Sequence, residues 1–185
     1  MRLATLLVVG LLLIASSALA EKAPYEYPAF DQPISRQGGD TFATATPITV
    51  LPFSGAGTTL GYTHDYDAVC PYTGSLAPDV VYSVVPCMDG ALDITLCAGS
   101  DYDTKLYVYD AAYTEIACND DECPGYVSEL TSALGTAVSV TAGATYYIII
   151  DGWSGASGNY TIDITGMDCT TPVEDSSFST VKSLF

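Results

Sequence analysis

The chain has 185 residues, a formal net charge of −17, and five lysines and arginines against 22 aspartates and glutamates. Nucleic acids and acidic membrane surfaces are poor partners for such a chain, because binding to either depends on clustered cations. The charge favours solubility and the binding of cations instead.

The first 20 residues have the pattern of a secretory signal peptide. One arginine is followed by a long apolar run and by Ala18-Leu19-Ala20, a small-x-small cleavage site. The alternative is an uncleaved membrane anchor, although the run is short for a stable span. No second run of this kind follows. We therefore expect no membrane span after signal cleavage, a location outside the cell or on its surface, and a mature chain of 165 residues.

Residues 21–39 hold three prolines and two glycines without a clear period, which predicts an irregular N-terminal arm. From residue 40 to residue 169, short alternating runs rich in β-branched and aromatic residues predict one all-β sandwich domain. Residues 170–185 are rich in serine and threonine and predict a tail, either frayed or used for docking. About eight strands are expected, at 47–53, 79–85, 91–97, 105–110, 115–118, 137–141, 145–151 and 160–165.

The cysteines predict a disulfide framework. An even number in an exported chain suggests three disulfides. Cys118 and Cys123 flank an acidic stretch, and we expect them to close a small loop, while the other four allow three pairings. Zinc is the alternative use of cysteine, but the chain has no CxxC pair and a single histidine. The six are Cys70, Cys87, Cys97, Cys118, Cys123 and Cys169.

Two acidic clusters flank the expected hairpin formed by 105–110 and 115–118. Asp101 and Asp103 precede its first strand, and their spacing points both side chains the same way in an extended chain. Asn119, Asp120 and Asp121 follow its second strand. Calcium takes six to eight oxygen ligands, chiefly carboxylates, carbonyls and water, so the two clusters predict a calcium site formed by these five residues. The alternative is that they are ordinary turn residues.

The body of the chain resembles the pre-peptidase C-terminal domain family of bacteria. The resemblance lies in GDTFATATPI near the start, PDVVYSV at 78–84, DYDTKLYVYD at 101–110, ACNDDEC at 117–123, TYYIIIDG at 145–152 and SGNYTIDIT at 157–165. It implies a secreted antiparallel sandwich of the jelly-roll type that accompanies exported enzymes. Some such domains resemble calcium-dependent modules that bind carbohydrate or matrix. We expect no catalytic domain beside the sandwich in this chain, which would be a departure from the family's usual arrangement.

The sequence gives little support for catalysis. His64, in an expected loop, is the only histidine, and neither a G-x-S-x-G elbow nor a glycine-rich phosphate loop is present. Paired carboxylates are used in glycoside hydrolysis, but here they cluster in tight loops, where cation binding explains them better. The sequence therefore predicts a protein that is not an enzyme.

Two non-enzymatic functions follow from these observations. The first is a calcium-binding module for an extracellular glycan or protein. Trp153, the only tryptophan, lies in a Gly/Ser-rich loop, where it either stacks on a sugar ring or covers the edge of the core. The second is a structural subunit of an extracellular filament or surface layer. In that case the arm or the tail adds a strand to another copy of the chain.

Overall fold

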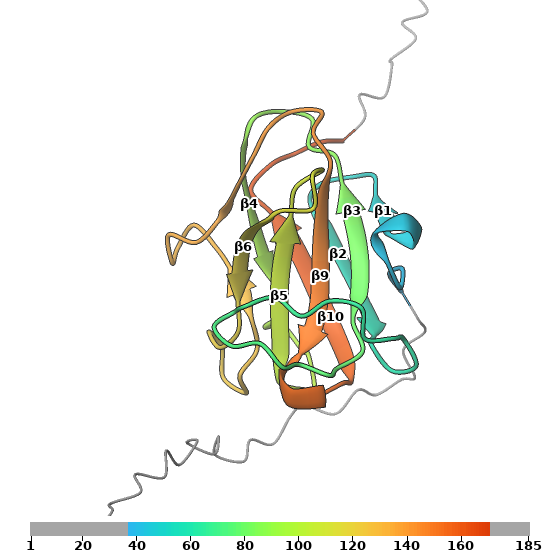
Figure 1. The fold of residues 1–185 in the computed structure, drawn as a ribbon. Coiled ribbons are helices and arrows are strands. Elements are labelled where there is room, and N and C mark those ends of the chain that lie inside the picture. The colour runs from blue at the N-terminus through green and yellow to red at the C-terminus, as the bar shows by residue number, and fades with distance from the viewer. Residues whose placement is uncertain (1–36, 171–185) are drawn as a thin grey trace, which may run out of the picture.

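The computed structural model describes residues 37–170. The predicted signal peptide, most of the predicted arm and all but the first residue of the predicted tail lie outside the described residues. The described part contains ten strands and two 3₁₀ turns, η1 (Phe42–Thr44) and η2 (Trp153–Gly155). Figure 1 shows the strands as two sheets packed face to face, which confirms the predicted β-sandwich. No helix within residues 37–170 is long and apolar enough to cross a membrane.

The first sheet has the strand order β1-β3-β9-β5-β6. Its pairings are antiparallel, except that β1 runs parallel to β3. The start of β5 therefore lies beside the ends of β6 and β9, and η2 follows β9 directly. We call this end of the sandwich, at the bottom of Figure 1, the lower end. The strands are β1 (Thr46–Ile48), β3 (Val80–Val84), β5 (Thr104–Tyr109), β6 (Glu115–Asn119) and β9 (Tyr146–Gly152).

The second sheet has the order β2-β10-β4-β7, and β8 also pairs with β4. All of these pairings are antiparallel. The strands are β2 (Phe53–Thr58), β4 (Gly90–Thr95), β7 (Glu129–Leu130), β8 (Val138–Val140) and β10 (Asn159–Thr165).

Seven of the eight predicted strands coincide with observed strands to within two residues at each end. The prediction of one strand over 47–53 was wrong, because the chain leaves β1 after Ile48 and starts β2 at Phe53 in the other sheet. Pro52, which lacks a backbone N–H, lies at this crossing. β2 beyond Phe53 and β7 were not predicted.

The core lies between the two sheets. β4 and β10 contribute alternate residues on one face of each strand, and these are at most 1% exposed. β3, β5 and β9 contribute the facing layer. Burying an aliphatic side chain of this size stabilises the fold by about 1.5–3 kcal/mol. The inward residues include Leu92, Ile94, Leu96, Ile162, Ile164, Val80, Leu106, Ile148 and Ile150.

A long irregular segment, residues 59–79, covers the lower half of the outer face of the first sheet. In Figure 1 it is the green loop that passes over β5 and β9. Ala68 and Cys70 in this segment pack against Val81, Tyr107 and Ile149 of the sheet. β9 is therefore buried on both faces, which explains why its sequence is an apolar run with little alternation.

Three disulfides tie the described residues together: Cys70–Cys118, Cys87–Cys169 and Cys97–Cys123. The predicted loop closed by Cys118 and Cys123 was therefore wrong. Cys118 packs on the outer face of the first sheet, where Cys70 lies, whereas Cys123 packs against the core between the sheets. The two sulfurs are thus on opposite faces.

Candidate functional site

Three of the five predicted metal ligands meet at the lower end. Asp103 precedes β5, and Asp120 and Asp121 follow β6. One carboxylate oxygen from each lies within 4.8 Å of the others. Asp120 is buried, Asp103 is partly buried and Asp121 is exposed. We call these three residues the acidic site.

A buried hydroxyl pair holds the two halves of the acidic site together. Thr104 and Ser128 are fully buried. The Ser128 hydroxyl donates to the Thr104 carbonyl at 2.6 Å and reaches the Asp120 carbonyl at 2.8 Å. The Ser128 N–H donates to the Thr104 hydroxyl at 2.8 Å. Because Asp103 is the residue before Thr104, these bonds fix its position relative to Asp120.

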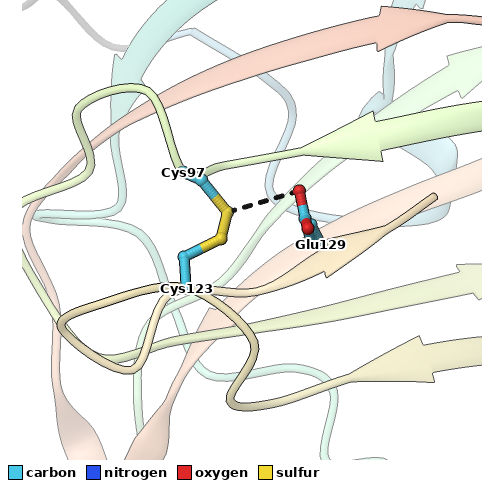
Figure 2. A group of neighbouring side chains, drawn as sticks. All are labelled: Cys97, Cys123 and Glu129. Carbon is cyan, nitrogen blue, oxygen red and sulfur yellow. Dashed lines mark hydrogen bonds between the residues drawn. A yellow bond between two sulfur atoms is a disulfide. The ribbon is translucent and has the colours of Figure 1, made fainter. Parts of the chain in front are cut away.

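The segment after Asp121 is a compact turn held by a disulfide. The backbone N–H groups of Glu122 and Cys123 both donate to the Val127 carbonyl. Cys123 is bonded to Cys97 at the end of β4, which joins the turn to the second sheet. Figure 2 shows Glu129 beside this disulfide, with a carboxylate oxygen 3.6 Å from the Cys97 sulfur. Since the two sulfurs are bonded to each other, this trio offers no thiolate to a metal.

The other two predicted ligands, Asp101 and Asn119, make hydrogen bonds to other segments. Asp101 accepts hydrogen bonds from the backbone N–H of Asn159 at 2.7 Å and from its side-chain amide at 2.9 Å. The side-chain oxygen of Asn119 accepts the N–H of Glu129 at 3.0 Å. The chain bends at Tyr102, whose ring is buried in the core. Asp101 and Asp103 therefore do not share the extended geometry that the spacing suggested.

Trp153 lies next to the acidic site. Its backbone N–H donates to the Asp103 carbonyl at 3.0 Å. Its half-buried ring meets Tyr72 edge to face, with 5.7 Å between the centroids. Tyr72 is 63% exposed. The two rings form an aromatic pair at the lower end, which the sequence did not predict because Tyr72 is 81 positions away from Trp153 in the chain.

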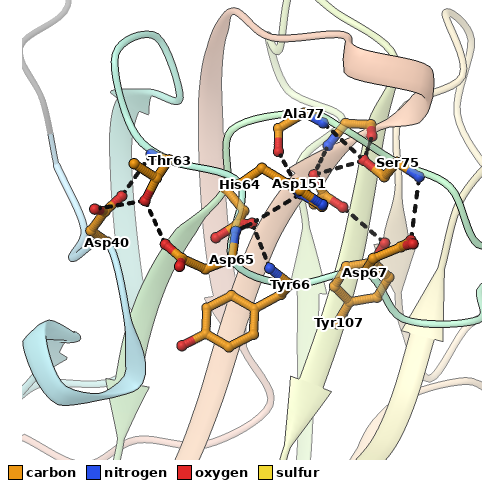
Figure 3. Close-up of polar contacts among 12 residues, drawn as sticks. Asp40, Thr63, His64, Asp65, Tyr66, Asp67, Ser75, Ala77, Tyr107 and Asp151 are labelled. Atoms are coloured by element: carbon orange, nitrogen blue, oxygen red, sulfur yellow. Dashed lines mark hydrogen bonds and ion pairs between the residues drawn. The ribbon is translucent and has the colours of Figure 1, made fainter.

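A second group of carboxylates is buried where segment 59–79 covers the first sheet. Asp79 is fully buried, and its Oδ2 accepts the backbone N–H groups of Asp65 and Tyr66 at 2.9 and 3.0 Å. Asp151 on β9 accepts the hydroxyls of Tyr107 and Ser75, at 3.0 and 3.2 Å. Figure 3 shows Asp151, Ser75 and Tyr107 beside the segment that carries Asp65 and Asp67. Burial is the main cause that raises the pKa of Asp79 to about 7 and that of Asp151 to about 6.

Lys105 and His64 border this buried network. Lys105 on β5 is fully buried, and its ammonium donates to the Tyr72 carbonyl at 2.8 Å. It also lies over the rings of Tyr107 and Trp153. The Nδ1 atom of His64 lies 3.2 Å from the Ala77 carbonyl and 3.9 Å from Asp79. The only sign of this network in the sequence is Lys105, a charged residue at the start of the predicted, otherwise largely apolar strand 105–110.

The solved structures of similar fold include the following three. The chain matches the periplasmic g-type lysozyme inhibitor PliG of Aeromonas hydrophila with 10% identity and a TM-score of 0.39, over 66% of this chain and 95% of that one. It matches the pre-peptidase C-terminal domain of Bacillus anthracis collagenase with 11% identity and a TM-score of 0.38, over 78% and 100%. PliG of Salmonella Typhimurium gives 11% identity and a TM-score of 0.39, over 67% and 100%.

No family model matches the chain, and no curated protein sequence matches it significantly. One of the three solved structures is a pre-peptidase C-terminal domain, the family that the sequence motifs resemble. The similarity is one of fold, and it carries no inference about what the chain binds.

Proposed function

We propose that this chain is an exported, non-catalytic binding module that holds one calcium ion at the acidic site and binds an extracellular glycan beside it. The observation that carries the proposal is the convergence of Asp103, Asp120 and Asp121, with carboxylate oxygens within 4.8 Å of one another. Three disulfides fit a protein that works in an oxidising compartment.

The chemistry of the acidic site favours a hard cation. Three carboxylates this close repel one another, and a divalent cation between them turns the repulsion into attraction. Calcium accepts carboxylate and carbonyl oxygens in flexible geometry and completes its shell with water. Asp120 supplies a buried oxygen, while the exposed Asp121 leaves the site open to solvent. The Thr104–Ser128 bonds hold the ligands in place, so that little ordering is needed on binding.

The aromatic pair supplies the second half of the proposed ligand site. Tyr72 and Trp153 present large ring surfaces at the lower end, and such surfaces pack against the apolar faces of sugar rings. A bound calcium ion would attract the hydroxyl oxygens of a sugar, because calcium binds oxygen ligands. Because the Trp153 N–H is bonded to the Asp103 carbonyl, order in the acidic site and the position of the indole are coupled.

We predict that immobilised polysaccharides retain the protein in millimolar calcium and at least about tenfold more weakly in EDTA. Trp153→Ala should weaken retention by about tenfold while leaving calcium affinity unchanged, because only ring contacts are lost. The measurement is retention on a panel of cell-wall and matrix polysaccharides.

Tyr113→Gly is the matched control, since it removes an exposed ring elsewhere on the surface and should leave retention unchanged. Retention that is equal in calcium and EDTA would contradict the proposal. Light scattering on the same samples tests the alternative of a filament subunit. Particles that grow in calcium without polysaccharide would favour that alternative.

A further inference from the structure

A cluster of five aromatic rings lies on the upper half of the outer face of the first sheet, and one of the five, Tyr66, belongs to segment 59–79. Phe42 of η1 is at its centre, with ring centroids 4.5 Å from Tyr66, 4.8 Å from Tyr147 and 4.5 Å from Tyr113. Tyr109 of β5 lies 5.5 Å from Phe42. We call these five residues the tyrosine patch. None of them takes part in the acidic site or in the aromatic pair with Trp153.

The most exposed ring of the tyrosine patch occupies a strained backbone position. Tyr113 has φ of 60°, the left-handed region that favours glycine, and it closes the turn between β5 and β6. Its N–H donates to the Asp110 carbonyl at 3.0 Å. A non-glycine residue there costs roughly 1–2 kcal/mol. The ring stacks on Phe42 yet stays 56% exposed, so the turn presents an aromatic face to solvent.

Two carboxylates lie near rings of the tyrosine patch. Glu115 on β6 lies directly opposite Tyr109 in the strand register, and Asp65 precedes Tyr66 in the chain. The closeness of Glu115 contributes to the raised pKa of Tyr109, about 12, after burial. A ring face bordered by carboxylates attracts cations through both the ring quadrupole and the negative charge.

The charge of the described surface decides which partner fits. Residues 37–170 contain seventeen aspartates and glutamates but a single lysine or arginine, Lys105, which is completely buried. The surface of this part of the chain therefore offers no lysine or arginine to an anionic partner. A cationic partner is complementary to both the patch and its surroundings.

We propose that the tyrosine patch is a docking surface for a cationic segment of a protein partner, with an arginine side chain stacked on the exposed ring of Tyr113 close to the carboxylates of Glu115 and Asp65. Arginine suits this surface better than lysine, because the planar guanidinium stacks on rings and also forms paired hydrogen bonds with a carboxylate. The surface is separate from the acidic site and does not require calcium.

The test uses the mature protein in EDTA at physiological salt, where screening limits binding by net charge alone. The probe is the blocked peptide Gly-Arg-Gly-Arg-Gly, followed by NMR shifts of the protein and by calorimetry. We expect shifts confined to the tyrosine patch and the two nearby carboxylates. Tyr113→Gly should weaken binding about fivefold, because it removes a cation–π contact while relieving the left-handed strain and leaving the net charge unchanged.

Tyr72→Ala is the matched control, as it removes a ring of similar exposure at the lower end and should leave peptide binding unchanged. Glu115→Gln should weaken binding, and a Gly-Lys-Gly-Lys-Gly peptide should bind more weakly than the arginine peptide. Equal binding by the wild type and Tyr113→Gly would overturn the proposal. NMR shifts spread over the whole acidic surface would also overturn it. The same holds if a neutral oligosaccharide, and not the peptide, produces the shifts at the tyrosine patch.

Discussion

Asp79→Asn is expected to stabilise the protein at pH 8 by roughly 3 to 4 kcal/mol, with a rise in Tm on the order of 10 °C, and to change stability little at pH 4. The reason is the fully buried position of Asp79, the last residue of segment 59–79. Its Oδ2 accepts two backbone N–H groups, whereas its Oδ1 accepts no hydrogen bond from the described residues. Asparagine keeps an acceptor for those N–H groups without the charge.

The raised pKa of Asp79 makes the folded protein less stable as the pH rises. Burial, with a smaller contribution from the carboxylate of Asp151, raises the pKa of Asp79 from 3.8 to about 7. Between these two values the folded protein keeps the proton and the unfolded chain has lost it. The unfolded state binds fewer protons, so stability falls as the pH rises from about 4 to about 7. Asp151, whose pKa is raised to about 6, adds to the fall.

The measurement is Tm against pH from 4 to 8 in EDTA, for the wild type and the variant. Asp89→Asn is the matched control, because Asp89 is exposed and asparagine retains the acceptor for the Ala142 N–H. We expect the control to follow the wild-type curve. Parallel curves for the wild type and Asp79→Asn would contradict this account of the buried network.

Removing the Cys97–Cys123 disulfide by a double change to serine is expected to lower the free energy of unfolding by about 3 kcal/mol. It should also weaken calcium binding by more than about tenfold. The disulfide closes a span of 26 residues and fixes the turn that follows Asp121. Without it, the ligands must be ordered by the ion itself. Denaturant unfolding and calcium calorimetry check the two expectations.

The Cys87–Cys169 disulfide supplies the control. It closes a longer span of 82 residues near the start of β4 and the end of β10, at the upper end of the sandwich. Its removal should destabilise the fold at least as much but leave calcium affinity unchanged. Equal losses of affinity in the two serine pairs would mean that affinity follows global stability and not the local order of the acidic site.

Much of the fold could be predicted from periodicity. Strands such as β4 and β10 have one apolar face, so their alternation is visible in sequence. β2 escaped prediction because FSGAGT contains two glycines and no alternating apolar set, and its register comes from pairing with β10. Gly57 on β2 faces the Tyr160 ring, where a Cβ would lie 2.4 Å from the hydroxyl oxygen. The need for glycine at this position therefore arises from packing between segments that are distant in the sequence, and it is not visible in the pattern of β2 itself.

The candidate site was predicted only in part. The hairpin brings Asp103 to the residues after β6, as the sequence indicated, because β5 and β6 are adjacent and antiparallel. The predicted role of Asp101 is not supported by its contacts. The chain bends at Tyr102, whose ring is buried, and the Asp101 carboxylate accepts a hydrogen bond from the N–H of Asn159, 58 positions further on. The Cys118–Cys123 error has the same origin, since proximity in sequence does not reveal on which face of a sheet a sulfur lies.

The most direct test of the calcium proposal is terbium luminescence excited through Trp153. Terbium is a luminescent substitute for calcium, and the only tryptophan is bonded through its backbone to Asp103. We predict sensitised emission that saturates at one ion per chain, is displaced by calcium, and is lost in Asp120→Asn. Emission that calcium does not displace, or that is equal in Asp120→Asn, would contradict a calcium site at Asp103, Asp120 and Asp121.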